Sequence, residues 1–250
     1  MEGVGDLALT GVGITFPIIM LISAFAALVG MGGAPLASIE LGRDNRERAN
    51  RILNNAATSL LILAVVLTAF FLAFKRPLLM FFGASEATIE YAVRYITIYV
   101  SGTVFVMIAL GLNAFITTQG FAKEGMLTVL IGAVLNIALD PLFIFTFDMG
   151  VRGAALATIL SQAVSAVWVL LFLTGKKTVL RLTLRHMPLR RDIMGAILSL
   201  GISPFIMQST ESLVMITLNS GLQLSLIHIS SKEEEVVEPA GCSAKGASIV

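Results

Sequence analysis

Charged residues are scarce in this chain of 250 residues. Charged side chains make up 13% of the sequence and hydrophobic ones 56%, whereas soluble domains are usually about 25% charged. The mean hydropathy of +0.90 is typical of a membrane protein, so we expect a lipid bilayer as its surroundings. The formal net charge is only +1, so no overall field attracts nucleic acid, and no nucleic-acid partner is expected.

Cysteine and histidine are almost missing as well. Cys242 is the single cysteine, which excludes an intrachain disulfide and a thiolate metal cluster. The two histidines, His186 and His228, lie outside the clearest apolar runs. A membrane-embedded enzyme would need clustered His, Cys or paired acids, so the sequence favours a protein that is not an enzyme and has no cofactor.

Long runs without charge predict transmembrane helices, because such a helix needs about 20 mostly apolar residues. Four runs contain no charged residue: 7–39, 52–74, 95–122 and 153–175. Two further runs qualify if each is allowed one acid, Asp140 or Glu211. We therefore predict an all-α membrane protein, a polytopic transmembrane helix bundle. Its six spans are expected at 10–37, 52–74, 93–118, 124–147, 153–175 and 193–222.

Basic residues gather in alternate loops between these spans. One set of loops carries 11 of them: Arg43, Arg46, Arg48, Arg51, Lys123, Lys176, Lys177, Arg181, Arg185, Arg190 and Arg191. The opposite set carries 4: Lys75, Arg76, Arg94 and Arg152. The positive-inside rule places the first set in the cytoplasm of a multi-pass plasma-membrane protein. The first span then runs from outside to inside, so we expect a preceding helix that this chain lacks.

The end of the chain differs from the rest. From Ser230 the composition turns acidic and small, with Glu233, Glu234, Glu235 and Glu238, which is typical of disorder. The stretch "LSLIHIS", residues 224–230, resembles a translated sequencing adapter, which favours an artificial join near residue 223. A natural solvated tail is the alternative. Either way, we expect residues 224–250 to be disordered or non-native.

The stretch "NIALDPLFIF", residues 136–145, places polar groups inside an apolar run. Asn136 and Asp140 are four residues apart and therefore share one helix face. An ionised aspartate inside a membrane is costly unless it faces a cavity or a partner. Pro141 has no N–H, so the carbonyl of Ile137 loses its helical partner. These oxygen ligands suit Na⁺, and the carboxylate alone suits H⁺. The structural alternative is that Asp140 caps or kinks a helix near its end.

Other polar residues in the spans are weaker candidates. Asn113 is of a type that often forms helix–helix hydrogen bonds in membranes. Thr158 and Gln162 share a helix face, although Thr commonly bonds its own backbone. Glu211, with Gln208 one turn before it, is a second candidate for coupling or substrate binding. Four prolines are predicted helix kinks: Pro17, Pro35, Pro141 and Pro204.

Three stretches of the sequence are similar to a known family. "GVGITFPI" with "ELGRDNRERANRILNNA" resembles a second helix and the loop after it. The most specific match is "GAVLNIALDPLFIFTFDMGVRGAALATILSQ", residues 132–162, and "LSLGISPFIMQSTESLVMITLN" looks like a seventh helix. The chain resembles the multidrug and toxic compound extrusion (MATE) transporters over about residues 3–223. It is more similar to the branch related to DNA-damage-inducible F proteins than to the NorM branch.

The resemblance implies a twelve-helix fold of two six-helix lobes around a central cavity. Residues 1–175 would be a partial N-lobe with helices two to six, and 176–192 a basic cytoplasmic loop. Residues 193–223 would be the first C-lobe helix. The first helix and the rest of the C-lobe would then be the missing partners of this chain.

The resemblance also implies a cation site. Asn136, Asp140 and Thr158 fall on positions that form it in the related branch, and Asn113 is the nearest match for a further asparagine. The family's first-helix aspartate has no counterpart here, and Glu211 matches a carboxylate found in some members. The expected function is a multidrug efflux antiporter that exchanges Na⁺ or H⁺ for cationic or amphipathic drugs. The alternatives are a lipid-linked oligosaccharide flippase of the wider superfamily and a truncated product without function.

Overall fold

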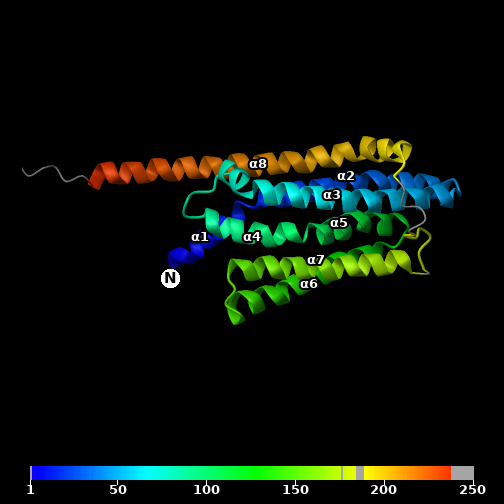
Figure 1. The fold of residues 1–250 in the computed structure, drawn as a ribbon, viewed down its shortest axis with the longest axis horizontal. Coiled ribbons are helices and arrows are strands. Elements are labelled where there is room, and N and C mark those ends of the chain that lie inside the picture. The colour runs from blue at the N-terminus through cyan, green and yellow to red at the C-terminus, as the bar shows by residue number, and fades with distance from the viewer. Residues whose placement is uncertain (1, 176, 184–188, 238–250) are drawn as a thin grey trace, which may run out of the picture.

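The computed structural model describes residues 2–175, 177–183 and 189–237, without the side chains of 2–4, 6, 220 and 222–237. Its described part is built of helices, drawn in Figure 1. They are α1 (Glu2–Gly13), α2 (Phe16–Gly42), α3 (Arg46–Phe81), α4 (Ile89–Ser101), α5 (Thr103–Thr118), α6 (Ala122–Pro141), the π-helix η1 (Leu142–Thr146), α7 (Val151–Thr174) and α8 (Arg191–Val237). The predicted all-α class is confirmed.

Among the described residues, five helical stretches are long and apolar enough to cross a membrane, and the pair α4–α5 makes a sixth if it counts as one span. The six predicted spans therefore each have a helical counterpart. Two of them are interrupted. The first is divided into α1 and α2 by a turn at Ile14 and Thr15, and the third is bent by 57° between α4 and α5. The long run of apolar residues predicts the crossing but not these breaks.

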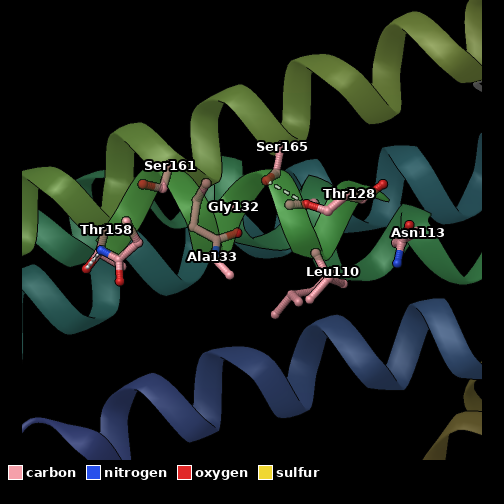
Figure 2. Close-up of a pocket in the computed structure, with 12 residues that line it drawn as sticks. Leu110, Asn113, Thr128, Gly132, Ala133, Thr158, Ser161 and Ser165 are labelled. Carbon is pink, nitrogen blue, oxygen red and sulfur yellow. Dashed lines mark hydrogen bonds between the residues drawn. The ribbon is translucent and has the colours of Figure 1, made fainter. Parts of the chain in front are cut away.

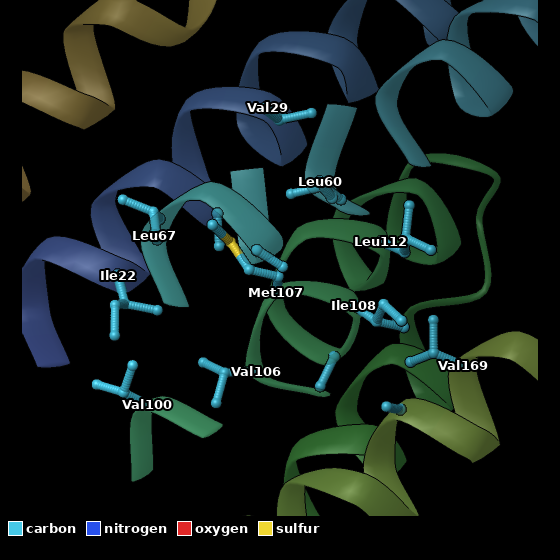
Figure 3. Packing of buried hydrophobic residues seen from close by; sticks show 14 of the residues in the cluster. Ile22, Val29, Leu60, Leu67, Val100, Val106, Met107, Ile108, Leu112 and Val169 are labelled. Atoms are coloured by element: carbon cyan, nitrogen blue, oxygen red, sulfur yellow. The ribbon is translucent and has the colours of Figure 1, made fainter. Parts of the chain in front are cut away.

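The packed core lies between α2, α3, α5 and α7, as Figure 3 shows. Ile22 and Val29 of α2 face Leu60 and Leu67 of α3, with Met107 of α5 beside them. Lipid is as apolar as these side chains, so close packing rather than escape from water holds such helices together.

The helices α2 and α8 make the closest contact of the bundle, and they run side by side in Figure 1. A Cβ on Gly201 of α8 would clash with the backbone carbonyl of Leu28, and one on Gly32 of α2 would clash with that of Ile197. Ser212 also donates a hydrogen bond to the carbonyl of Pro17, at 3.0 Å. Small residues on both helices therefore let the two backbones touch.

The four predicted proline kinks take different forms. Pro17 lies in the first turn of α2, where a missing N–H costs nothing. Helices α2 and α8 run through Pro35 and Pro204 without a break in helical structure. Pro141 is the last residue of α6, and the chain passes there from an α-helix to a π-helix.

Helix α8 continues to Val237, beyond residue 223 where we expected it to end. The difference covers 224–237, and the helix-forming residues Lys232 to Glu235 explain why an acidic composition need not end a helix. The rest of the expected tail, 238–250, lies outside the described residues.

Candidate functional site

Three side chains from two helices meet on the lower part of the bundle in Figure 1, where α6 and α7 lie side by side. Asn136 of α6 donates from Nδ2 to Asp140 Oδ1, at 3.3 Å, and to Thr158 Oγ1 of α7, at 3.5 Å. Thr158 in turn donates to the carbonyl of Ala154, at 3.0 Å. All three side chains are half-buried. The helix-face argument for Asn136 and Asp140 agrees with this geometry, and Thr158 lies beside them.

The backbone next to Asp140 is irregular. After Pro141, residues Leu142–Thr146 form the π-helix η1, and the N–H of Phe147 donates to the carbonyl of Leu142, five residues back. Single π-turns within helices often accompany functional sites. Since Pro141 cannot donate to Ile137, the Asp140 carboxylate is followed by a helix with a changed hydrogen-bond pattern.

A cavity of about 240 Å³ lies beside this cluster, between α5, α6 and α7. Figure 2 shows Thr158 and Ser161 toward one end and Asn113 at the other. The lining residues are Ala109, Leu110, Asn113, Thr128, Val129, Gly132, Ala133, Asn136, Thr158, Ser161, Gln162 and Ser165. They carry hydroxyl and carboxamide groups but no formal charge. A drug-sized ligand usually needs about 300 Å³ or more, so this cavity holds at most part of one.

Asn113 shares the cavity with Asn136 but not the cluster around Asp140. It lies near the opposite end in Figure 2, and among the described residues no hydrogen bond joins its side chain to Asp140. Its Oδ1 is buried and has no hydrogen-bond partner among the described residues. A buried acceptor without a partner is costly, so Asn113 is a polar group available to a ligand. Gln162, the other weak candidate, also lines the cavity.

Glu211 and Gln208 are on α8, whose main contacts are with α2. Neither residue is among those that line the cavity. Glu211 is exposed and Gln208 is half-buried. The structure therefore does not bring these two candidates together with Asp140.

The sequence reasoning missed Tyr95 of α4. This buried side chain interacts with Thr158 and with the charge of Asp140, and its ring stacks on that of Tyr99, with 6.2 Å between the centroids. Tyr91, Tyr95 and Tyr99 recur every four residues. This spacing places three hydroxyl groups on one helix face and was the signal that could have identified the residue.

The cluster suits a small cation. The Asp140 carboxylate, the Thr158 hydroxyl and the Ile137 carbonyl are hard oxygen donors. Asn136 presents its NH₂ group to Asp140, so a cation there requires the carboxamide to turn its oxygen inward. The described residues contain no group of three His, Cys, Asp or Glu side chains that could hold a metal ion. The residues present fit Na⁺ or H⁺ rather than a transition metal.

A bundle of helices long enough to cross a membrane, with a carboxylate beside an interrupted helix and a polar cavity, is an arrangement that membrane transporters use. The family model MatE matches residues 1–142. The chain therefore belongs to the MATE family, which consists of transporters rather than enzymes.

The chain is similar to proteins named multidrug export protein MepA. It is 28% identical over 199 residues to that of Staphylococcus haemolyticus (strain JCSC1435), which covers 80% of this chain and 44% of the relative. It is 23% identical over 211 residues to that of Staphylococcus aureus (strain NCTC 8325 / PS 47), and this match covers 84% of this chain and 47% of the relative. This chain thus spans about half the length of the curated relatives that it matches.

Solved structures give the same result. An inward-facing multidrug resistance MATE family transporter of the MOP superfamily matches with a TM-score of 0.81 and 30% identity, over 88% of this chain and 53% of that one. A MATE crystal structure in the bent conformation matches with a TM-score of 0.81 and 33% identity, over 88% of this chain and 49% of that one. The predicted fold, a transmembrane helix bundle that is part of a MATE transporter, is confirmed.

Proposed function

We propose that this chain carries the coupling-cation site of a multidrug efflux antiporter in the plasma membrane. The observation that carries the proposal is the cluster of Asn136, Asp140 and Thr158 on two membrane-crossing helices. A carboxylate at this depth is costly unless it binds a proton, a cation or a polar partner. The names of the relatives, multidrug export proteins, support the assignment to drug efflux.

Binding of Na⁺ or H⁺ at Asp140 would compete with the hydrogen bond from Asn136, which is 3.3 Å long. The π-helix that follows Pro141 gives α6 a place to change its hydrogen-bond pattern. We propose that cation binding shifts α6 against α7 and releases the drug outward, and that drug binding requires the converse. This is alternating access around a fixed site.

The cavity favours an uncharged or cationic cargo over an anionic one. None of its lining residues is Lys or Arg, and a carrier of a lipid-linked phosphate would need such groups to compensate the negative charge. The small volume, about 240 Å³, and the match to only about half of each relative's length favour a drug site whose other walls come from outside the matched segment. Cationic or amphipathic drugs are therefore the proposed substrates.

The basic loops support a cytoplasmic location for one end of the bundle. The α2–α3, α5–α6 and α7–α8 connections lie at the same end in Figure 1. Described basic residues lie in these connections or in the first turns of the helices that follow them: Arg43, Arg46, Arg48, Lys123, Lys177, Arg181, Arg190 and Arg191. The turns between α3 and α4 and between α6 and α7 lie at the other end. The positive-inside rule assigns the first end to the cytoplasm.

Efflux of a fluorescent organic cation such as ethidium from cells tests the proposal. The complete protein that contains this chain is compared with its Asp140→Asn variant at equal expression. We expect the variant to lose efflux, because asparagine cannot release a proton or neutralise a cation. The matched control is Asp148→Asn, an exposed aspartate with φ of 51°, a conformation that asparagine tolerates.

Undiminished efflux by Asp140→Asn would refute the role of this carboxylate. The 250-residue chain expressed alone forms a further arm. If the 250-residue chain alone shows efflux comparable to that of the complete protein, the view that other segments complete the cavity is refuted. If the complete protein shows efflux and the 250-residue chain alone does not, that view is supported.

A further inference from the structure

The linker that joins α7 to α8 is held by side chains of two other helices. Four of its backbone N–H groups donate to carboxamide oxygens at ordinary hydrogen-bond distances. The pairs are Leu180 with Gln119 (2.9 Å), Arg181 with Asn50 (2.8 Å), Thr183 with Asn54 (2.8 Å) and Arg190 with Asn55 (2.7 Å). The asparagines belong to the first turns of α3, and Gln119 follows α5 directly.

The carboxamides are aimed by their own helices. The NH₂ group of Asn54 donates to the carbonyl of Asn50, four residues back, at 2.7 Å. Asn55 donates in the same way to Arg51, at 2.9 Å, and Gln119 to Phe115, at 2.8 Å. Because the NH₂ group is fixed to the helix, the oxygen of each carboxamide points away from it and toward the linker. An ionised aspartate could not be oriented in this way, because its carboxylate has no N–H to donate to the helix carbonyl.

Asn54 makes a second contact that identifies what is recognised. It donates to the carbonyl of Arg181, at 3.1 Å, while it accepts from the N–H of Thr183. The linker thus offers Asn54 a carbonyl on one residue and an N–H two residues later. A β-strand offers the same two groups, at the same spacing, to a parallel neighbour. The side chain of Asn54 therefore binds two backbone groups of the linker and not a particular side chain.

Burial makes these contacts necessary. Asn54 and Asn55 are both fully buried, so without the linker their oxygens would lie in the packed bundle without a partner, at a cost. Leu180 is fully buried too, and Leu182 packs against the core. The contact continues onto α8, where Met194 Sδ lies 3.0 Å from Ser59 Oγ of α3. Polar and apolar contacts thus fix the same segment.

We propose that Asn50, Asn54, Asn55 and Gln119 form a backbone-recognition site, the carboxamide clamp, which fixes the ends of the linker to α3 and α5. The described parts of the linker then move with α3. A movement of α8 relative to α3 must strain or break the contacts at Arg190 and Met194, where the linker enters α8. The clamp does not depend on the proposed transport function.

Amide hydrogen exchange of the 250-residue chain in detergent micelles, resolved by residue with NMR, tests the clamp. We expect the amides of Leu180, Arg181, Thr183 and Arg190 to exchange about 5- to 10-fold slower than free peptide amides, the protection that one hydrogen bond gives. If these four amides of the unmodified chain exchange at the free peptide rate, the proposal is refuted and no variant is needed.

Variants assign each bond. Asn50→Ala should speed exchange at Arg181, and Asn54→Leu at Thr183, each to about the free peptide rate. Asn54→Asp keeps the oxygen but loses the donor that aims it, so it should give an intermediate rate at Thr183. Far-UV circular dichroism checks that each variant remains helical. If Asn54→Leu does not fold, the half-buried Asn50 still supplies the test.

The matched control is Thr68→Val, which removes a hydrogen bond of similar length from α3 to the carbonyl of Val100 (3.2 Å), far from the linker. Its linker amides should exchange at wild-type rates. The proposal fails if the Asn50 and Asn54 variants leave the linker rates unchanged, or if Thr68→Val raises them equally.

Discussion

The two sides of this bundle are packed very differently. Half of the most apolar window of Leu7–Gly42, which contains α2, is buried against other helices, but only 6% of that of Ala122–Thr146, which contains α6 and η1. Yet the candidate cation site is on α6. Close packing resists movement. We therefore expect the densely packed helices to form a rigid frame and α6 to be the helix that can shift.

The largest difference between the two regions is expected when the same side chain is removed from each. Phe71 of α3 is 2% exposed and Phe145 of η1 is 79% exposed. We expect Phe71→Ala to lower the free energy of unfolding by about 3 kcal/mol, the low end of the usual range for such core substitutions. The low end is chosen because lipid is as apolar as the protein core, so that burial away from lipid adds little stability. Phe145→Ala should change it by less than about 0.5 kcal/mol.

Denaturant titration of the chain in mixed micelles, followed by circular dichroism, measures both values. Equal losses in the two variants would contradict the division into a packed frame and a loosely packed α6.

A smaller effect is expected at the α2–α8 contact, which belongs to the packed frame. Gly201→Ala adds a methyl group where the Leu28 carbonyl already lies, and such overpacking costs about 1–3 kcal/mol. Gly195→Ala is the matched control on the same helix, because a Cβ there meets nothing within 4 Å. It should stabilise the helix by up to about 1 kcal/mol. Thermal unfolding in detergent should separate the two variants in opposite directions.

The smallest effect is expected between α6 and α7. Ser165 donates to the carbonyl of Thr128, at 3.0 Å, and this is a direct hydrogen bond that joins the two helices. Ser165→Ala should cost about 0.6 kcal/mol, the average for such bonds in membranes. Ser101→Ala is the control, because the Ser101 hydroxyl is exposed and bonds only to its own helix. A loss of several kcal/mol at Ser165 would show that α6 is held as firmly as the frame.

Much of this architecture could be predicted from the sequence. Charge-free runs identify the spans because lipid penalises charge wherever it occurs in the chain. The pairing of Asn136 with Asp140 follows from helix geometry alone. Thr158 came from the family resemblance, since nothing in its own surroundings in the sequence relates it to α6.

Other features had no local signal. Asn54 and the linker residue Arg181 are 127 positions apart, and no periodicity connects them. The bend at Gly102 depends on Ile159 of α7, whose side chain occupies the space that a Cβ at this glycine would need. Tyr95 lies in an amphipathic helix where a tyrosine usually marks the membrane interface. In each case the deciding contact is between helices, which a single sequence does not display.

Asp140 is the residue proposed to couple cation movement to drug movement. Proteoliposomes that contain the complete protein test this coupling, when an imposed Na⁺ gradient or an imposed pH gradient drives uptake of an organic cation. We expect one of the two gradients to drive uptake by the wild type, Asp140→Asn to abolish this uptake and Asp148→Asn to retain it. Gradient-driven uptake by Asp140→Asn at the wild-type rate would refute the coupling role of this carboxylate.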